Sequence, residues 1–212
     1  MTGPPVLVFG AGGHGKVVVA TLQAAGRTVA AILDDDAERW NATVLGVPVC
    51  GPCALSRELG PHDAVLAVGD NRARRALATS LEAVSGLAWT TAVHPSATVH
   101  ASVLVGPGTV VFAGAVVQPD VVLGAHAIVN TAASIDHDCR LGDFAHLAPG
   151  SRLAGHVEVG EGALLGLGSG VLPGCRVGAW AVVGAGATVT GAVGDGWVVV
   201  GTPARRRGGA GR

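Results

Sequence analysis

Aliphatic residues recur at every sixth position through the second half of the chain, without an insertion or a miss from residue 93 to residue 189. A fixed period of this kind predicts a solenoid, and a period of six residues predicts a parallel β-helix. An α-helix fails as an interpretation, because a six-residue step would travel around its surface instead of keeping to one face. The residues in this register are Val93, Val99, Val105, Val111, Val117, Leu123, Val129, Ile135, Leu141, Leu147, Leu153, Val159, Leu165, Val171, Val177, Val183 and Val189.

The residue four positions beyond each of these aliphatic residues is always small or β-branched, as at Ala97, Thr109, Cys139 and Val193. Three six-residue repeats make one coil of a triangular prism, and the coils stack at roughly the 4.8 Å spacing of β-strands. The aliphatic residue then points inward at each flat face, and the small residue fills the space near each corner. Residues 91–212 are therefore predicted to form an all-β left-handed parallel β-helix of hexapeptide repeats, with a short C-terminal tail.

The first part of the chain has a different pattern, in which apolar runs alternate with helical stretches. Residues 6–9 form an apolar run typical of a strand buried on both faces of a parallel sheet. Further strands are predicted at residues 29–33 and 64–68, and helices at about residues 17–25 and 72–84. Residues 1–90 are therefore predicted to form an α/β Rossmann-like half-domain, which leads into the first coil without a flexible linker.

A glycine-rich turn joins the first predicted strand to the first predicted helix. Gly10, Gly12 and Gly15 match the spacing of the dinucleotide-binding fingerprint, and acidic residues follow the second strand at Asp34 and Asp35. Such glycines let backbone N–H groups approach a pyrophosphate, whose negative charge the helix N-terminus favours. An NAD site would match this motif, and the pyrophosphate of a nucleotide sugar would use the same features; a plain tight turn is the third interpretation.

The charge balance argues against two classes of partner. The chain has 14 Lys and Arg against 15 Asp and Glu, a formal net charge of −1, so no nucleic-acid partner and no membrane are predicted. No apolar run reaches membrane-spanning length. Because the first residues also lack a basic segment and a cleavage site, we expect a cytoplasmic protein.

The cysteines give no firm sign of redox or metal chemistry. Cys139 and Cys175 fall at the small inward position, where filling the core is the simplest interpretation. Cys50 and Cys53 enclose Gly-Pro as in the thioredoxin redox motif, but no thioredoxin-like pattern surrounds them and a second pair of zinc ligands is missing. We interpret residues 50–53 as a loop and predict no metal site.

His137 is the residue whose surroundings suggest catalysis. It lies two residues beyond the inward Ile135, at an outward turn, and Asp136 and Asp138 flank it. Neighbouring carboxylates raise the pKa of a histidine and steady its ring. One coil further on stands Gly155, which predicts open space beside the imidazole. We therefore predict a base that faces a substrate, with a structural histidine as the alternative. The remaining histidines that lack a partner pattern, and are expected in surface or turn roles, are His62, His94, His100, His126 and His156.

A set of short motifs is distributed over both halves of the chain. They are Gly-Ala-Gly-Gly-His-Gly at residues 10–15, Leu-Asp-Asp at 33–35, Gly-Asp-Asn at 69–71, Asn-Thr at 130–131, Ile-Asp-His-Asp-Cys at 135–139, Gly-Asp-Phe-Ala-His at 142–146, Pro-Gly at 149–150 and Val-Gly-Thr-Pro-Ala at 200–204. With these motifs the chain resembles the PglD/NeuD-type sugar acetyltransferases over nearly its whole length. The resemblance implies a homotrimer that uses acetyl-coenzyme A (acetyl-CoA), with each active site between two neighbouring β-helices. The acceptor that it implies is the amino group of a UDP-linked 4-amino sugar, a GDP-linked amino sugar or a sialic acid hydroxyl.

The same resemblance implies roles for individual residues. His137 corresponds to the catalytic base and Asp138 to the carboxylate that raises its basicity, with Asp136 as an alternative partner. The implied cofactor-lining residues are His146, Gly155, Leu167 and Ala185. The implied contacts to the nucleotide sugar are Gly12, Gly13, His14, Asp34, Asp35 and Gly69.

Several functions stay open at this point. The best-supported function is N-acetylation of a UDP- or GDP-linked amino sugar, by direct transfer because Cys139 faces the core and cannot carry the acetyl group. The same base could serve a sialic acid or sugar O-acetyltransferase. Less favoured alternatives are a β-helix metalloenzyme with zinc held by histidines, and a nucleotide-sensing scaffold without enzymatic activity.

Overall fold

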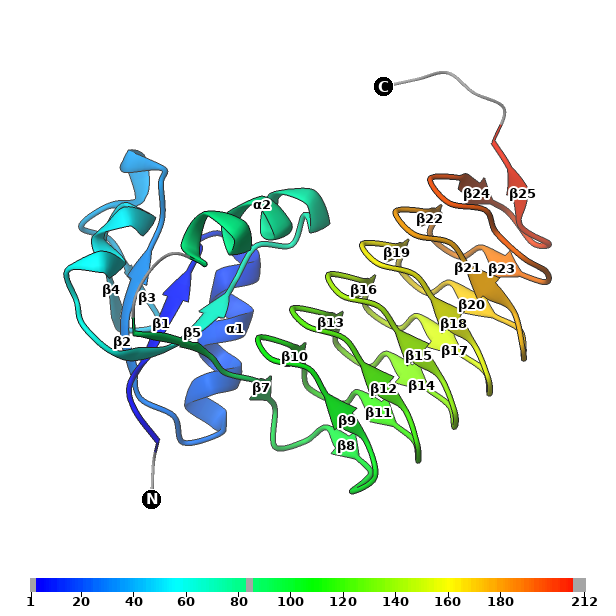
Figure 1. The fold of residues 1–212 in the computed structure, drawn as a ribbon, viewed down its shortest axis with the longest axis horizontal. Coiled ribbons are helices and arrows are strands. Elements are labelled where there is room, and N and C mark those ends of the chain that lie inside the picture. Colours follow the sequence, from blue (N-terminus) through cyan, green and yellow to red (C-terminus); the bar gives the residue numbers. More distant parts are fainter. Residues whose placement is uncertain (1–2, 83–85, 208–212) are drawn as a thin grey trace.

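The computed structural model describes residues 3–82 and 86–207, and Figure 1 shows an α/β part joined directly to a long β-helix. The α/β part is built on a sheet of strand order β3-β4-β2-β1-β5-β6, parallel except for the β3–β4 pair. Its elements are β1 (Val6–Phe9), α1 (Gly13–Ala24), β2 (Val29–Leu33), η1 (Ala37–Arg39), β3 (Thr43–Val44), β4 (Val47–Gly51), η2 (Cys53–Arg57), β5 (His62–Leu66), α2 (Asn71–Leu81) and β6 (Leu87–Trp89), where η denotes a 3-10 helix.

The predicted elements of this part exist, but some of their ends differ. α1 begins at Gly13 and not near residue 17, because Gly12 is its N-cap, so the glycine-rich turn runs straight into the helix. α2 begins at Asn71, where the side chain of Asp70 accepts a hydrogen bond from the N–H of Ala73 at 2.8 Å. The predicted end of that helix, near residue 84, lies outside the described residues. The third predicted strand is β5, which starts and ends two residues earlier than expected.

The second part is a left-handed parallel β-helix with three flat faces, as the sequence predicted. Face 1 contains β7 (Ala92–Val93), β10 (Val110–Val111), β13 (Ile128–Val129), β16 (His146–Leu147), β19 (Leu164–Leu165), β22 (Val182–Val183), β24 (Val198–Val200) and, antiparallel at its end, β25 (Arg205–Arg206). Face 2 contains β8 (Thr98–Val99), β11 (Val116–Val117), β14 (Ser134–Ile135), β17 (Arg152–Leu153), β20 (Gly170–Val171) and β23 (Thr188–Val189). Face 3 contains β9 (Leu104–Val105), β12 (Val122–Leu123), β15 (Arg140–Leu141), β18 (Glu158–Val159) and β21 (Arg176–Val177).

The aliphatic register fills the interior of the prism. Every residue of the register from Val111 to Val189 is buried, and these residues form one continuous core with the small corner residues. Val93, Val99 and Val105 are only partly buried, because they belong to the first coil, which has no coil before it.

The corners of the prism are made by residues in the left-handed backbone region, with φ between 53° and 70°. These residues recur at every sixth position. Glycine is frequent among them, because any other residue in this conformation lowers the conformational stability by about 1–2 kcal/mol. In chain order they are Gly108, Gly114, Asp120, His126, Ala132, Asp138, Phe144, Gly150, His156, Gly162, Gly168, Gly174, Trp180 and Gly186. We name each corner by the faces it joins, so Asp138 and His156 lie on corner 2/3, and His126 and Phe144 on corner 3/1.

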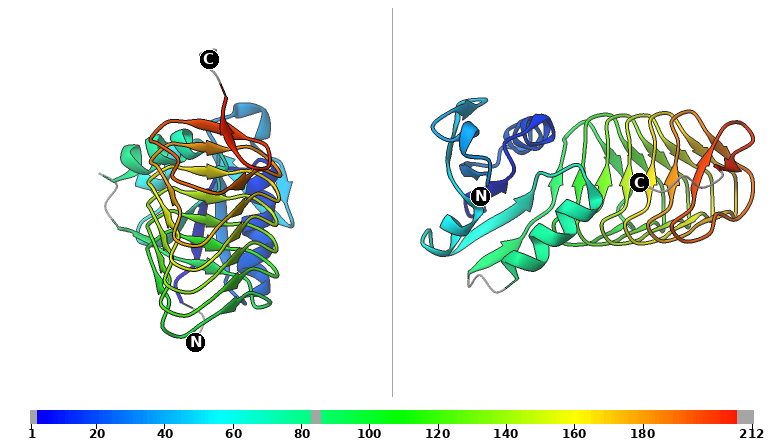
Figure 2. Two further views of the ribbon diagram at one scale, coloured as in Figure 1. Left: turned by 90° about the vertical axis from the view of Figure 1, so that its right-hand side faces the viewer. Right: turned by 90° about the horizontal axis from the view of Figure 1, so that it is seen from above.

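The α/β part lies at one end of the β-helix (Figure 2). It packs against face 1 of the first coils, and Arg74 of α2 bonds to His126 and Phe144 of corner 3/1. Val8 and Val19 share a hydrophobic cluster with Val110, Phe112 and Ile128 of face 1. The two parts therefore have a common core, and corner 2/3 lies on the opposite side of the prism from the α/β part. No helix in the described part of the chain is long and apolar enough to cross a membrane.

Candidate active site

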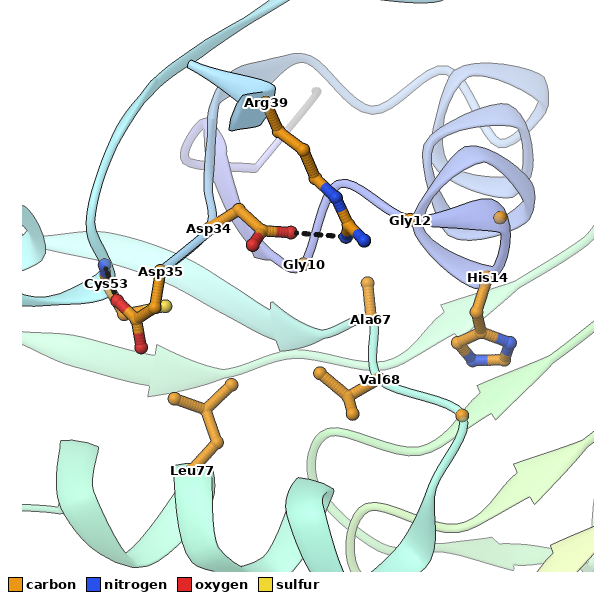
Figure 3. A pocket seen from close by; sticks show the side chains of 12 residues that line it. Gly10, Gly12, His14, Asp34, Asp35, Arg39, Cys53, Ala67, Val68 and Leu77 are labelled. Carbon is orange, nitrogen blue, oxygen red and sulfur yellow. Dashed lines mark hydrogen bonds and ion pairs between the residues drawn. The ribbon is translucent and has the colours of Figure 1, made fainter. Parts of the chain in front are cut away.

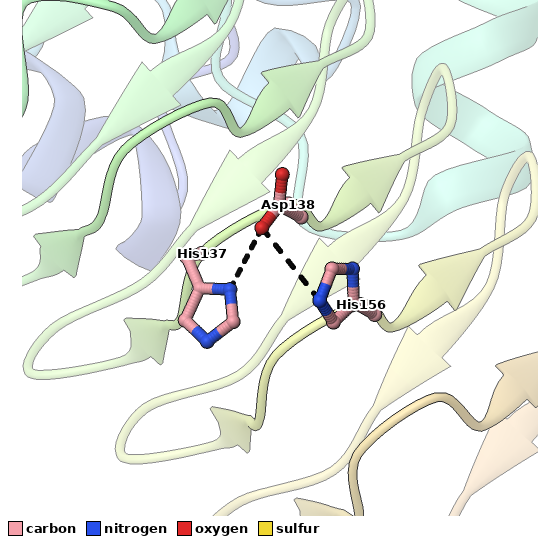
Figure 4. A group of neighbouring side chains, drawn as sticks. All are labelled: His137, Asp138 and His156. Carbon is pink, nitrogen blue, oxygen red and sulfur yellow. Dashed lines mark hydrogen bonds and ion pairs between the residues drawn. The ribbon is translucent and has the colours of Figure 1, made fainter.

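His137 and Asp138 form a hydrogen-bonded pair on corner 2/3 (Figure 4). The ring Nδ1 lies 2.8 Å from Oδ2 of Asp138, and the side chains are 51% and 46% exposed. Because a carboxylate only accepts, Nδ1 carries the proton and Nε2 keeps a free lone pair. The hydrogen bond to Asp138 is the main cause that raises the pKa of His137; desolvation opposes it, and the charges of Asp136 and Asp138 add to it. This is the arrangement of an imidazole that accepts a proton at Nε2.

Asp136, the alternative partner, has a different contact. Its Oδ1 accepts a hydrogen bond from the backbone N–H of His137 at 2.9 Å. Asp136 therefore fixes the backbone of the turn, and Asp138 is the residue that holds the ring.

The space predicted beside His137 is not open, which corrects the sequence analysis. The imidazole itself lies over Gly155, so that a Cβ on Gly155 would come within 2.7 Å of Cε1 and Nε2. Because Gly155 has no side chain, the imidazole ring of His137 can pack directly over its backbone. A substrate would therefore have to approach the ring from the solvent side.

His156, which was expected in a surface or turn role, is a neighbour of this pair. Its Nε2 lies 3.7 Å from Oδ2 of Asp138, and its ring stands edge-on to that of His137 with 5.1 Å between ring centroids. The signal was present in the sequence, because Asp138 and His156 occupy the same corner position in consecutive coils. Parallel stacking of coils brings such residues together.

A second site is a cavity of about 370 Å³ at the carboxyl ends of the parallel strands in the α/β part (Figure 3). This is where open α/β sheets bind ligands. It is lined by every residue predicted to contact the nucleotide sugar, namely Gly12, Gly13, His14, Asp34, Asp35 and Gly69, and also by Gly10, Arg39, Cys53, Ala67, Val68 and Leu77.

Asp34 holds the glycine-rich turn in place. Its Oδ2 accepts hydrogen bonds from the N–H of Ala11 at 2.6 Å and from Arg39 at 3.0 Å, and its Oδ1 accepts one from the N–H of Asp36 at 2.9 Å. Burial opposes ionisation, but these donors together lower the pKa of Asp34. Arg39, which the sequence analysis missed, lies over Gly12, where a Cβ would be 3.2 Å from Nη1. The cavity therefore has a cation next to the turn that would receive a pyrophosphate.

The Cys-Gly-Pro-Cys segment borders this cavity through Cys53. Burial, and secondarily the charge of Asp35, raises the pKa of Cys53 to about 12, so its thiol stays protonated. Its N–H donates to Oδ1 of Asp35 at 2.8 Å, which ties η2 to the end of β2. Cys50 at the end of β4 is exposed, and both thiols are free. Because redox chemistry requires a thiolate, Cys53 is unsuited to it. Residues 50–53, which were predicted to form a loop, instead belong to the end of β4 and the start of η2.

His14 and His146 lie between the cavity and face 1. His146 donates from Nδ1 to the carbonyl oxygen of Gly69 at 3.2 Å, and its Nε2 accepts from the amide of Asn130 at 3.1 Å. Nε2 of His14 is buried and has no partner in the residues the structure describes, and its ring lies 6.2 Å from that of His146. Burial, with help from the charge of Arg74, lowers both pKa values to about 4, so both rings are neutral at physiological pH.

The remaining predicted cofactor-lining residues lie on a different corner from the base. Leu167 and Ala185 are exposed on corner 1/2, in consecutive coils, and Leu167 is 60% exposed. His137 and Gly155 lie on corner 2/3, and the nucleotide cavity is beside face 1. One chain therefore does not bring the predicted base together with the cavity or with corner 1/2.

Comparison with known proteins places this architecture in one class, the β-helix acetyltransferases with an α/β N-terminal part. The PglD N-terminal domain family matches residues 5–81. The chain is 43% identical to a mutant form of perosamine N-acetyltransferase from Caulobacter crescentus, whose structure contains CoA and GDP-perosamine, with a TM-score of 0.91 and 97% of each chain covered. It is 41% identical to the acetyltransferase domain of PglB from Neisseria gonorrhoeae FA1090 in complex with acetyl coenzyme A, with a TM-score of 0.90, 96% of this chain and 99% of that chain covered.

A curated relative agrees with these structures. UDP-N-acetylbacillosamine N-acetyltransferase from Bacillus subtilis (strain 168) is 40% identical over 115 residues, which span 51% of this chain and 51% of that protein. The matched segment thus covers about half the length of this relative, whereas the structural relatives are matched over nearly their whole length. The chain belongs to the PglD-type family of sugar acetyltransferases.

Proposed function

We propose that this protein transfers the acetyl group of acetyl-CoA to the amino group of a nucleotide-linked amino sugar. The observation that carries the proposal is the His137–Asp138 pair, in which Nδ1 is held by a carboxylate and Nε2 is free. The relatives that were crystallised with CoA and GDP-perosamine, or with acetyl coenzyme A, support both substrates.

The proposed reaction is a direct transfer. The neutral sugar amine attacks the thioester carbonyl carbon while Nε2 of His137 takes one amine proton, and Asp138 stabilises the resulting imidazolium. The C–S bond then breaks, and the imidazolium returns the proton to the departing sulfur, so that CoA leaves as a thiol. Cys139 does not take part, since it is fully buried and its Sγ lies 3.1 Å from the carbonyl oxygen of Ala154.

The separation of the two sites supports a homotrimer. The nucleotide cavity lies beside face 1 and His137 lies on the opposite corner, so a neighbouring chain has to supply one of the two. We propose that acetyl-CoA lies between adjacent prisms and contacts Gly155 of corner 2/3 and Leu167 and Ala185 of corner 1/2. His146 would contact it only through ring carbons, because both of its nitrogens are bonded within the chain.

The nucleotide part of the acceptor is proposed to occupy the cavity of the α/β part. Its pyrophosphate would meet the N–H groups of Gly12 and Gly13 at the start of α1, close to the ring of His14. Asp35 and Gly69 would contact the nucleoside. Asp34 would contribute by fixing the glycine-rich turn, since it accepts a hydrogen bond from the N–H of Ala11.

A thiol-release assay tests the proposal. Acetyl-CoA is supplied with UDP-linked 4-amino sugars, GDP-linked 4-amino sugars or sialic acid, and the acetylated product is identified by mass spectrometry. We expect release with a nucleotide-linked amino sugar and an amide product. Release only with sialic acid, giving an ester, would show an O-acetyltransferase, and no release with any acceptor would refute the proposal.

A further inference from the structure

Three side chains on corner 2/3 present metal-ligating atoms to one point (Figure 4). One ring nitrogen of His137, one carboxylate oxygen of Asp138 and one ring nitrogen of His156 all lie within 4.8 Å of one another. Within residues 3–82 and 86–207 this is the one such group of three or more His, Cys, Asp or Glu side chains. Two imidazoles and one carboxylate are a donor set that suits zinc and leaves a fourth position open.

The two separations that involve Asp138 are close to those of a zinc site. With metal–ligand bonds of about 2.0–2.2 Å, tetrahedral ligands stand about 3.3–3.5 Å apart. The observed separations are 2.8 Å between Nδ1 of His137 and Oδ2 of Asp138, and 3.7 Å between Oδ2 and Nε2 of His156. These two separations lie within 1 Å of the required value, and the third, between the two imidazoles, is at most 4.8 Å, so the exposed rings would close on the ion by side-chain rotation.

The backbone holds these groups without a flexible loop. The N–H of His156 donates to the carbonyl oxygen of His137 at 3.0 Å, which joins the two coils at the corner itself. Asp138 and His156 share the left-handed conformation that the corner imposes, and the ring of His137 packs over Gly155. A bound ion would therefore have to order only the three side chains, since the backbone that bears them is already fixed.

We propose that His137, Asp138 and His156 form a Zn²⁺ site whose occupation switches off acetyl transfer. A base that accepts the amine proton at Nε2 needs its own ring proton on Nδ1. Zinc bound at Nδ1 uses the lone pair of that atom, so the neutral ring carries its proton on Nε2 and has no lone pair for the amine. The binding of zinc stands on the geometry alone, whereas the inhibition also rests on the proposed function.

Direct binding is the first test. Tag-free protein carrying Cys50→Ser, which removes an exposed thiol, is titrated with Zn²⁺ against a chromophoric chelator, and with Co²⁺ to record the visible absorption of a four-coordinate site. We expect one ion per chain, and binding at least about tenfold weaker in His156→Asn, since loss of a ligand costs at least as much as loss of an outer-shell partner. His100→Asn, which removes an exposed histidine elsewhere on the prism, should bind as the parent does. Equal affinity of the His156→Asn and parent proteins, or no binding by the parent, overturns the site.

Inhibition is the second test, read as loss of thioester absorbance so that zinc bound to the CoA thiol does not disturb the signal. The rate of each protein is compared with and without Zn²⁺, so a change of basal rate in a variant cancels. We expect zinc to inhibit the parent and His100→Asn proteins at concentrations at least about tenfold lower than the His156→Asn protein, and Mg²⁺, which prefers oxygen ligands, to have no effect. Zinc bound at the site without inhibition overturns the switch. If no acceptor is acetylated, the proposed function fails while the titration still decides the site.

Discussion

Arg74 of α2 donates a hydrogen bond from Nη2 to the carbonyl oxygen of Phe144 at 2.7 Å, across the junction between the two parts of the chain. Its Nε donates to the carbonyl oxygen of His126 at 2.9 Å, and its Nη1 donates to those of Val68 and Gly69. The side chain is 1% exposed, and burial lowers its pKa to about 10, so it stays charged at neutral pH. One buried guanidinium thus holds the Gly69 turn of the nucleotide cavity against two coils of the β-helix.

Replacement of Arg74 tests this junction. Arg74→Met keeps much of the apolar bulk but leaves the carbonyl groups of His126 and Phe144 buried without a donor. We expect a loss of about 2–4 kcal/mol in the free energy of unfolding, and a raised KM for the nucleotide sugar. Urea unfolding and initial rates measure the two effects. Arg57→Met, at an exposed position of η2, should change stability by no more than about 0.5 kcal/mol; equal losses in both variants would contradict the role of Arg74.

Removal of the predicted base should separate catalysis from folding. His137→Ala is expected to lower kcat by about 10²–10⁴-fold, while the thermal midpoint stays close to that of the parent because the side chain is half exposed. His100→Ala is the matched control and should retain its rate. Turnover by His137→Ala within a few-fold of the parent would refute the assignment of the base.

The pH dependence of kcat should report the His137–Asp138 contact. Since the pKa of His137 is raised above 6.5, kcat should fall as the pH drops through that raised value, because the protonated ring cannot accept the amine proton. In Asp138→Asn the main cause of the shift is removed, so the acid limb should move to lower pH and the maximal rate should decrease. NMR titration of the ring gives an independent reading. An acid limb that does not move would show that Asp138 leaves the pKa unchanged.

The packing of the His137 imidazole over Gly155 can be tested by adding a methyl group at residue 155. Gly155→Ala places a methyl group 2.7 Å from two ring atoms of His137, so the ring has to turn away from its position beside Asp138. Misplacement of about 1 Å can cost 10²-fold in rate, and we expect a large loss of kcat without a loss of fold. A Cβ on Gly191 would meet nothing within 4 Å, so Gly191→Ala serves as the control. Full activity of Gly155→Ala would mean that the position of the ring is not critical.

Acid should destabilise the protein through its buried histidines. Burial lowers the pKa of His126 to about 4, and His14 and His146 behave alike. These groups are neutral in the folded state but bind protons in the unfolded state below about pH 6.5, so their contribution to stability is present above pH 6.5 and is lost as the pH falls toward 4. His126→Phe keeps a ring that stacks on Phe144 and meets Trp89, and it removes one such proton.

The measurement for this variant is the free energy of unfolding at pH 7.5 and pH 5. We expect His126→Phe to lose less stability between the two pH values than the parent. An equal loss of stability in both proteins would contradict the prediction, because it would mean that folding does not change the pKa of His126.

Much of the fold could be read from local pattern, and less of the site. The register from Val93 to Val189 predicted three faces and an inward side, because each repeat obeys the same turn geometry. Every residue that the resemblance implied as a nucleotide-sugar contact lines the cavity of the α/β part, and its role in binding stays a prediction. Arg39 was missed although Asp34 and Asp36 are close to it in sequence, because its position over the glycine-rich turn depends on the path of the chain after β2. His156 was missed because its relation to Asp138 appears only when positions one coil apart are compared.

The sequence by itself determined the β-helix, the α/β part and the position of the His137–Asp138 pair, since these depend on residues that are close along the chain. Only the tertiary structure decided that His126 is buried and not on the surface, that His137 fills the space over Gly155, and that the nucleotide cavity and the base lie on opposite sides of one chain. Those features arise when coils stack and when α2 docks on corner 3/1. They depend on contacts such as Arg74 to Phe144, which join residues 70 positions apart and leave no periodic signal in the sequence.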